Sequence, residues 1–286
     1  MVDARSAQLA PSPHKLDRWR RLPNSAAAMG WQLAHTEALF AGLAAGGPPT
    51  IRWYRPTRRA LVLGHGQVLD RADLAAARAA GIAAYKRTSG GAAVLIDRAA
   101  LSLDIALPAS HPLTTTDVTL AYRWVGDVWA DALRALGIVD ARTIPTGEVR
   151  EMPALPPDDT LRLACYGTLS PWEVVVGRRK VVGLSQVRRR AGVVYPIGVH
   201  LLWRPERLTR LLALTPAARR ALTASLGRLA AGLDELLGQP VAANEVIIAV
   251  ERALIQRVGV ALTRGGWTHA EREAAARLER ERFQPL

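Results

Sequence analysis

The sequence predicts an α+β fold in which mixed, largely antiparallel sheets carry packed helices and the C-terminal portion is helical. Short apolar runs separated by glycine-bearing loops recur between positions 51 and 202, whereas helical periodicity dominates after position 215. With 286 residues, 49% of them hydrophobic, the chain is long enough to bury a large core. We therefore expect an N-terminal arm at residues 1–24, a folded body at 25–205 and a helical portion of the same domain at 206–286.

The first half of the body begins with a helix and continues mostly as strands. Apolar residues at helical spacing predict a helix over 26–43, which the Gly-Gly-Pro-Pro segment 46–49 ends. A shorter helix is predicted over 73–80 and is expected to end at Gly81. Compact or alternating apolar runs predict strands over 51–54, 60–63, 82–86, 92–96 and 101–107. This arrangement favours antiparallel pairing.

The second half combines one long helix, a hairpin and a helical tail. An amphipathic stripe predicts a helix over 117–136, and a proline- and acid-rich stretch predicts a loop over 145–160. Two apolar runs around a Gly-Arg-Arg turn predict a β-hairpin with strands over 172–176 and 180–184. A further strand is predicted over 193–202, and helices over 215–238, 241–258 and 268–283, the last opening with a capping-box spacing.

The chain is strongly basic, with 38 Lys and Arg against 25 Asp and Glu and a formal net charge of +13. Because the basic residues are spread along the chain, this charge fits a genome that favours arginine codons better than a nucleic-acid-binding protein, and we do not expect a nucleic acid partner. In either case a basic surface would attract an acidic protein partner. The single cysteine, Cys165, excludes an intramolecular disulfide and a cysteine-rich metal site. No apolar run is long enough to cross a membrane and no signal-peptide pattern opens the chain, so we expect a cytoplasmic protein with no membrane partner.

A glycine loop between two predicted strands is the strongest candidate binding motif. In the loop 87–91, Arg-Thr-Ser-Gly-Gly, the glycines let backbone N–H groups approach a ligand, while Arg87 offers a cationic fork and Ser89 a small donor. Such a loop suits an acyl carbonyl or a phosphate, although a Gly-Gly pair is also common in plain turns. A second loop, Gly-His-Gly-Gln at 64–67, also follows a predicted strand.

Lys180 and Cys165 are the candidate catalytic residues. Lys180 begins the return strand of the hairpin, a position where a lysine is often only a solvated edge charge. Cys165 precedes the hairpin, and a lone cysteine is often a small buried hydrophobe. If the chain folds back so that the two side chains are neighbours, the ammonium group would favour a thiolate and so supply a nucleophile.

Three motifs in this order resemble the lipoate-protein ligase and octanoyltransferase superfamily. They are the 64–67 loop, the 87–94 loop and the 177–186 segment Gly-Arg-Arg-Lys-Val-Val-Gly-Leu-Ser-Gln, and the resemblance covers about 19–203. It implies a catalytic domain of the class II biotin- and lipoyl-ligase type, with a tunnel for a medium-length acyl chain whose carbonyl Lys180 contacts. The implied acyl-binding residues are Arg87, Ser89, Gly90, Gly91, Gly64, His65, Gln67, Gly183, Ser185 and Gln186.

Within this superfamily the chain is most similar to the cysteine-dependent octanoyltransferases and octanoyl-carrier amidotransferases. Cys165 stands where that branch has its cysteine, whereas Ala92 replaces the usual third glycine and 195–198 lacks a His-Gly pair. The resemblance implies that, in lipoate assembly, the Cys165 thiolate takes an octanoyl or lipoyl group as a thioester and passes it to a lysine of a lipoyl domain. Lys180 and loop N–H groups would stabilise the oxyanion.

The resemblance also implies the partners of the reaction. The donor would be an octanoylated carrier protein, either the glycine-cleavage carrier or acyl carrier protein, and the acceptor an apo lipoyl domain of a 2-oxoacid dehydrogenase. This transfer requires no metal or other cofactor. The alternatives are a lipoate-protein ligase, which would use ATP and Mg and leave Cys165 a bystander, and a non-catalytic basic module for nucleic acid. A biotin-protein ligase is disfavoured because its glycine-arginine loop and leading helix-turn-helix domain are missing.

Overall fold

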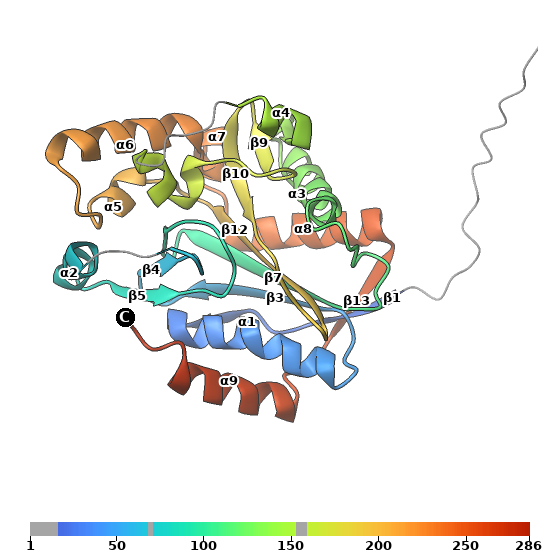
Figure 1. Cartoon of the computed structure of the whole chain (residues 1–286). Helices are drawn as coiled ribbons and strands as arrows, with labels where there is room; N and C mark the ends of the chain where they lie inside the picture. Colours follow the sequence, from blue (N-terminus) through green and yellow to red (C-terminus); the bar gives the residue numbers. More distant parts are fainter. Residues whose placement is uncertain (1–16, 68–70, 153–158) are drawn as a thin grey trace, which may run out of the picture.

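A large mixed sheet runs through the molecule, and a small sheet lies beside it (Figure 1). The computed structural model describes residues 17–67, 71–152 and 159–286. The strands of the large sheet are β1 (Asp17–Arg21), β2 (Ser25–Ala27), β3 (Thr50–Pro56), β7 (Ala100–Pro108), β8 (Ala141–Thr143), β9 (Val174–Val176), β10 (Arg179–Leu184), β11 (Val187–Arg189), β12 (Gly192–His200) and β13 (Val260–Arg264). Their order is β13-β1-β3-β7-β12-β10-β9-β8, with β2 paired to β3 and β11 to β12.

The large sheet is antiparallel through its centre and parallel towards the β13 edge. β3 pairs with β7, β7 with β12 and β12 with β10 in antiparallel fashion, whereas β1 runs parallel to both β3 and β13. In the small sheet, β4 (Ala60–Leu63) lies between a parallel β5 (Ala83–Lys86) and an antiparallel β6 (Val94–Ile96). The predicted α+β class with mixed, largely antiparallel sheets is therefore confirmed.

Helices cover both faces of the large sheet (Figure 1). On one face, α1 (Met29–Ala44) packs against β3, β7 and β12, and α9 (His269–Glu281) packs on α1. On the other face, α3 (Arg123–Ala135) and α8 (Ala243–Val258) pack together over the main hydrophobic core. The remaining helices are α2 (Arg71–Ala79), α4 (Thr146–Arg150), α5 (Pro205–Thr209), α6 (Pro216–Leu229) and α7 (Leu233–Leu237), with 3-10 turns at Leu120–Tyr122, Thr160–Leu163 and Cys165–Gly167.

Alternation along the strands gives the large sheet one apolar face and one partly polar face. Ile51 and Trp53 of β3 belong to the main core under α3 and α8. Arg52, which lies between them in the sequence, points to the opposite face and donates a hydrogen bond to the Gln32 carbonyl oxygen of α1 at 3.1 Å. The polar face under α1 and the neighbouring loops is therefore the one available for a binding site.

Residues 17–21 do not form the arm that the sequence predicts. They form β1, which lies between β3 and β13, and the Trp19 side chain is fully buried. The strand has a single large apolar residue among charged ones, and its parallel partner begins at Val260, so no local pattern indicates it. The rest of the predicted arm that precedes β1, residues 1–16, lies outside the described residues.

The C-terminal portion is helical, as predicted, apart from β13, which completes the large sheet. The capping box at the start of α9 is confirmed, because the Thr268 hydroxyl accepts a hydrogen bond from the Glu271 N–H and the Glu271 carboxylate accepts one from the Thr268 N–H. The predicted loop over 145–160 contains the short helix α4, and its residues 153–158 lie outside the described residues.

Candidate functional site

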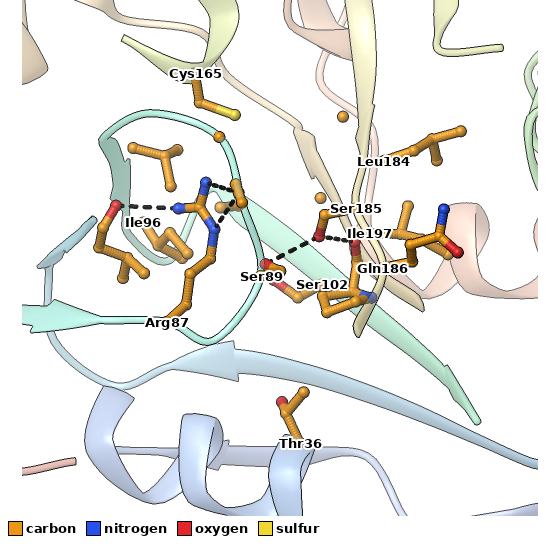
Figure 2. A pocket seen from close by; sticks show the side chains of 18 of the residues that line it. Thr36, Arg87, Ser89, Ile96, Ser102, Cys165, Leu184, Ser185, Gln186 and Ile197 are labelled. Carbon is orange, nitrogen blue, oxygen red and sulfur yellow. Dashed lines mark hydrogen bonds between the residues drawn. The ribbon is translucent and has the colours of Figure 1, made fainter. Parts of the chain in front are cut away.

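A cavity of about 280 Å³ lies between α1, the polar face of the large sheet and the loop 87–91 (Figure 2). Apolar side chains from α1, from β6 and β12, and from the segment after α9 line part of its wall. They are Met29, Leu33, Val94, Ile96, Ile197 and Phe283. A concave, largely apolar space with a few convergent polar groups is typical of a site for a small apolar ligand.

Arg87 folds back onto its own loop, as Figure 2 shows. Its Nη2 donates hydrogen bonds to the carbonyl oxygens of Gly90 at 2.8 Å and Ala92 at 3.0 Å, and its Nη1 donates one to that of Val62 at 3.2 Å. Gly91 has a φ of 95°, a conformation that favours glycine. The cationic fork expected to meet a ligand is thus engaged with backbone carbonyls, and Arg87 shapes the wall of the cavity.

The 64–67 loop supports the 87–91 loop from behind. A Cβ on Gly64 would lie 1.7 Å from the Gly91 carbonyl oxygen, so no other residue allows this approach. The His65 N–H donates to the Ser89 carbonyl oxygen at 2.9 Å, and the Gln67 side chain donates to the backbone just before Cys165. Gly64, His65 and Gln67 do not line the cavity, so here the structure differs from the acyl contacts that the resemblance implied.

Ser89 and Ser185 join the 87–91 loop to the end of β10. Their hydroxyl oxygens lie 3.2 Å apart, and Ser185 also lies within hydrogen-bond distance of the Pro196 carbonyl oxygen, at 2.8 Å (Figure 2). Two sequence motifs more than 90 residues apart thus form one wall. The sequence-predicted site residues that line the cavity are Arg87, Ser89, Gly90, Gly91, Cys165, Lys180, Gly183, Ser185 and Gln186.

Lys180 is a buried cation at the inner wall of the cavity. Its side chain is 3% exposed, and its Nζ lies 2.7 Å from Glu173 Oε1 and donates to the Cys165 carbonyl oxygen at 3.1 Å. Burial acts to lower the pKa of Lys180, but the charges of Glu173 and Cys165 outweigh it and raise that pKa above its ordinary value. Lys180 is therefore an ammonium group at neutral pH. It is buried, unlike the solvated lysines that often lie at the edge of a hairpin.

Glu173 is a site residue that sequence reasoning missed. Its carboxylate also accepts hydrogen bonds from the Ser170 N–H at 2.9 Å and the Leu184 N–H at 3.2 Å. The preceding Trp172 has a φ of 69°, the one positive value at a non-glycine position among the described residues. An acidic residue directly before an otherwise apolar strand, in the hairpin that carries Lys180, was the available signal.

Cys165 is half-buried beside the glycine loop. Its N–H donates to the Ala93 carbonyl oxygen at 2.8 Å, which ties the segment to the end of that loop. Its Sγ lies 3.9 Å from the position that a Cβ on Gly91 would take, and Figure 2 shows the side chain directly above the loop. The structure thus brings together Cys165, Lys180 and the glycine loop, which the sequence places far apart.

A buried aromatic group next to Lys180 was also missed. The Tyr166 hydroxyl donates to the Gly198 carbonyl oxygen at 3.0 Å, and its ring packs against His200 and Trp203. Burial lowers the pKa of His200 to about 4, although the charge of Asp97 acts in the opposite direction. The imidazole that lines this part of the cavity is therefore neutral at neutral pH.

The described residues contain no cluster of three or more His, Cys, Asp or Glu side chains that could hold a metal ion. Within those same ranges, no helix is long and apolar enough to cross a membrane. The chemistry that the site itself offers comes from a thiol, a buried ammonium–carboxylate pair and backbone N–H groups around an apolar cavity.

Relatives with curated names cover almost the entire chain. The chain is 30% identical to the octanoyltransferase LipM of Kyrpidia tusciae over 266 residues, which cover 92% of this chain and 95% of the relative. It is also 30% identical to the octanoyltransferase LipM of Symbiobacterium thermophilum over 243 residues, 82% of this chain and 84% of the relative.

Solved structures match the fold closely at lower sequence identity. A bi-partite lipoate protein ligase of Thermoplasma acidophilum superimposes with a TM-score of 0.73 at 19% identity, covering 93% of each chain. A lipoate-protein ligase A bound with ATP gives a TM-score of 0.71 at 20% identity, covering 94% of this chain and 96% of the other. The family model for the lipoyl protein ligase A/B catalytic domain matches residues 29–255, a span that includes every predicted site residue. The chain therefore belongs to the lipoyl protein ligase A/B catalytic domain family, as its three motifs predicted.

Proposed function

We propose that this protein transfers an octanoyl group from a carrier protein to a lysine of a lipoyl domain through a thioester on Cys165. One observation carries the proposal. The buried Lys180 ammonium donates a hydrogen bond to the carbonyl oxygen of Cys165, and the Cys165 thiol lies over the glycine loop of an apolar cavity. Relatives named octanoyltransferase span almost the whole chain, which confirms the acyltransferase class and supports octanoyl as the group transferred.

In the first half-reaction, the Cys165 thiolate attacks the carbonyl carbon of the octanoyl donor. A carbon–sulfur bond forms as the bond to the carrier breaks, and the carrier leaves as a thiol or an amine after taking up a proton. The oxyanion that develops is stabilised by the Lys180 ammonium and by N–H groups of the glycine loop. The octanoyl chain lies in the apolar cavity, away from water.

In the second half-reaction, the uncharged amine of a lipoyl-domain lysine attacks the thioester on Cys165. The new amide bond forms as the carbon–sulfur bond breaks, the amine nitrogen gives its proton to solvent, and the thiolate is restored. Because Glu173 keeps Lys180 charged in a buried position, the same cation serves both half-reactions. Hydrolysis is suppressed because the acyl chain excludes water from the cavity.

The acceptor and donor are proposed on chemical grounds. The T. acidophilum lipoate protein ligase is described together with its E2 lipoyl domain, which supports a lipoyl domain as acceptor for a protein of the same fold. The donor is an octanoylated carrier protein, with the acyl group held either as a thioester on acyl carrier protein or as an amide on the glycine-cleavage carrier. The formal charge of +13 favours acidic partners of either kind.

Intact-mass spectrometry tests this proposal directly. The purified protein is mixed with each octanoylated carrier in turn and with an apo lipoyl domain, without ATP, for the wild type and for Cys165→Ala. We expect an octanoyl adduct on the enzyme and on the lipoyl domain in the wild type, and neither adduct in the variant. The carrier that supports transfer identifies the donor.

The same experiment separates transfer from ligation. If the lipoyl domain is acylated only when free octanoate and ATP are supplied, and Cys165→Ala acylates it equally well, the thioester mechanism is wrong and an ATP-dependent ligase replaces it. Cys165→Ser serves as a matched control, because an oxygen in place of sulfur keeps the size of the side chain while removing most of its nucleophilicity.

A further inference from the structure

The floor of the cavity is a row of residues paired across four neighbouring strands. Tyr54 of β3 pairs with Ser102 of β7, Ser102 with Gly198 of β12, and Gly198 with Gly183 of β10. Residues directly opposite each other in antiparallel strands point to the same face, and all four line the cavity. At roughly 4.8 Å between neighbouring strands, the row is about 14 Å long.

The Gly183 end of the row lies beside the reacting groups. Lys180 Cε is 3.5 Å and the Tyr166 hydroxyl oxygen 3.8 Å from the position that a Cβ on Gly183 would take. Lys180 is also bonded to the Cys165 carbonyl oxygen. An acyl carbonyl at Cys165 therefore has the start of the row beneath it.

The middle of the row is open. A Cβ placed on Gly198 would meet no atom within 4 Å, although Gly198 lies in a central strand with β7 on one side and β10 on the other. Ser102, the next residue of the row, has a small side chain that ends in a hydroxyl group. A glycine inside a strand with free space above it is typical of a site where another molecule approaches the backbone closely.

The Tyr54 end of the row is closed by hydroxyl groups in front of a buried ion pair. Thr36 donates to Asp104 Oδ2 at 2.7 Å, and Arg52 lies 2.9 Å from the same oxygen, with both charged side chains fully buried. Burial raises the pKa of the Tyr54 hydroxyl, and its interactions with the side chains of Thr36 and Ser102 act in the opposite direction, so the three hydroxyl groups are neighbours. In Figure 2, Thr36 lies at the opposite end of the cavity from Cys165.

We propose that this row gauges the length of the acyl chain, with Gly198 as the residue that lets a medium-length chain pass and the hydroxyls of Tyr54, Ser102 and Thr36 as the end wall. The inference rests on the proposed function. With C–C bonds of about 1.5 Å, an extended octanoyl chain spans roughly 9 Å from its first to its last carbon. This length is close to the roughly 10 Å of two strand spacings between Gly183 and Ser102, where the wall begins. In a longer acyl chain, the additional methylene groups press against the buried hydroxyls of the end wall and displace their polar neighbours.

Two variants at successive positions of the row test the gauge. Acyl carrier protein loaded with butanoyl, hexanoyl, octanoyl, decanoyl or dodecanoyl groups is the donor, and the rate of Cys165 acylation is measured by intact mass. We expect the wild-type rate to be highest with octanoyl. Gly198→Ala should lower the octanoyl rate ~10-fold or more and spare butanoyl, whereas Ser102→Val, which is farther from Cys165, should also spare hexanoyl.

Gly227→Ala is the matched control. Gly227 is exposed on α6, outside the cavity, and a Cβ there also meets no atom within 4 Å, so this variant should keep the wild-type profile. The gauge is overturned if the wild type acylates equally well with dodecanoyl and octanoyl. It is also overturned if Gly198→Ala lowers the rates for all chain lengths by the same factor or leaves the profile unchanged.

Thermal melting with free alkanoates separates failure of the gauge from failure of the proposed function. If no donor acylates Cys165, the proposed function is wrong, and the gauge is judged by ligand protection alone. Octanoate should then raise the wild-type melting temperature more than dodecanoate does, and Gly198→Ala should lose protection by octanoate while keeping protection by butanoate. Equal protection of wild type and variant by octanoate would reject the gauge.

Discussion

The buried pair between Lys180 and Glu173 is the most consequential contact at the scale of single residues. Both side chains are 3% exposed, so removal of the carboxylate leaves a cation without its charge partner in a place where water cannot replace it. We expect Glu173→Gln to lower the free energy of unfolding by about 3 kcal/mol or more and to slow acylation of Cys165. Denaturant unfolding and intact-mass kinetics measure the two effects.

Glu235→Gln is the control for this variant. Glu235 of α7 forms an ion pair with Arg179, which lies on the same hairpin as Lys180. The Glu235 side chain is 54% exposed, so water screens the pair and replaces the lost contact. The unfolding midpoint of this variant should stay close to that of the wild type. If Glu173→Gln behaved in the same way, Lys180 would not depend on a buried carboxylate.

His200 predicts a specific pH dependence of stability. Its side chain packs between the rings of Tyr166 and Trp203 with Asp97 as the nearby charge, and burial lowers its pKa to about 4. In the unfolded chain the pKa is 6.5, so between pH 4 and 6.5 the unfolded state binds more protons. Stability contributed by neutral His200 is therefore present above pH 6.5 and falls by about 3 kcal/mol as the pH drops to 4.

The variant His200→Phe isolates this contribution, because phenylalanine keeps the aromatic packing and cannot take up a proton. The difference in unfolding free energy between wild type and variant should change by about 3 kcal/mol between pH 6.5 and 4, to the disadvantage of the wild type. His35, whose pKa burial also lowers to about 4, is common to both proteins and cancels. A constant difference across this pH range would show that His200 takes up no proton on unfolding.

The site residues that could be predicted from the sequence are those that lie in continuous motifs. The 87–91 loop, Lys180 and Cys165 all line the cavity. Glu173 and Gly198 were missed because their importance depends on strand register, which aligns residues from different hairpins. The sequence also could not show which groups Arg87 binds, because a guanidinium group can bind a ligand or the carbonyl oxygens of its own loop equally well.

At the scale of elements, long periodic segments were predicted well and short strands poorly. The helix predicted over 241–258 is Ala243–Val258, and the strand predicted over 60–63 is Ala60–Leu63. By contrast, β1, β8 and β11 went undetected, because strands of three to five residues with few apolar side chains form only when a partner is in place. Pairing with a neighbouring strand in the folded protein, rather than a local preference for β-structure, therefore determines whether these strands form.

Trp19 tests whether β1 is an integral strand. The side chain is fully buried and meets the Trp124 and His111 rings edge-on. We expect Trp19→Ala to lower the free energy of unfolding by about 3–5 kcal/mol, because it empties a core position. The exposed neighbour Arg18 provides the control, and Arg18→Ala should leave the denaturant midpoint nearly unchanged. Equal midpoints for the two variants would mean that β1 contributes little to the core.

At the scale of the whole molecule, the charge of +13 predicts how partners are captured. If the lipoyl domain is acidic, long-range attraction raises its encounter rate, and salt weakens that attraction as the screening length falls from about 14 Å at 0.05 M to about 4 Å at 0.5 M. The KM for the lipoyl domain should therefore rise several-fold over this range while kcat stays constant. A KM that does not change with salt would show that apolar contacts dominate docking.

The parallel pairing of β1 with β13 has a consequence for how the chain is made. β1 leaves the ribosome long before its partner, because Val260–Arg264 lies much later in the sequence. Until then, the nascent sheet has an unpaired edge next to Trp19, the kind of surface that chaperones hold. The edge stays open until β13 has been made, so a product truncated within α8 contains Cys165 and Lys180 but has an open, aggregation-prone sheet edge.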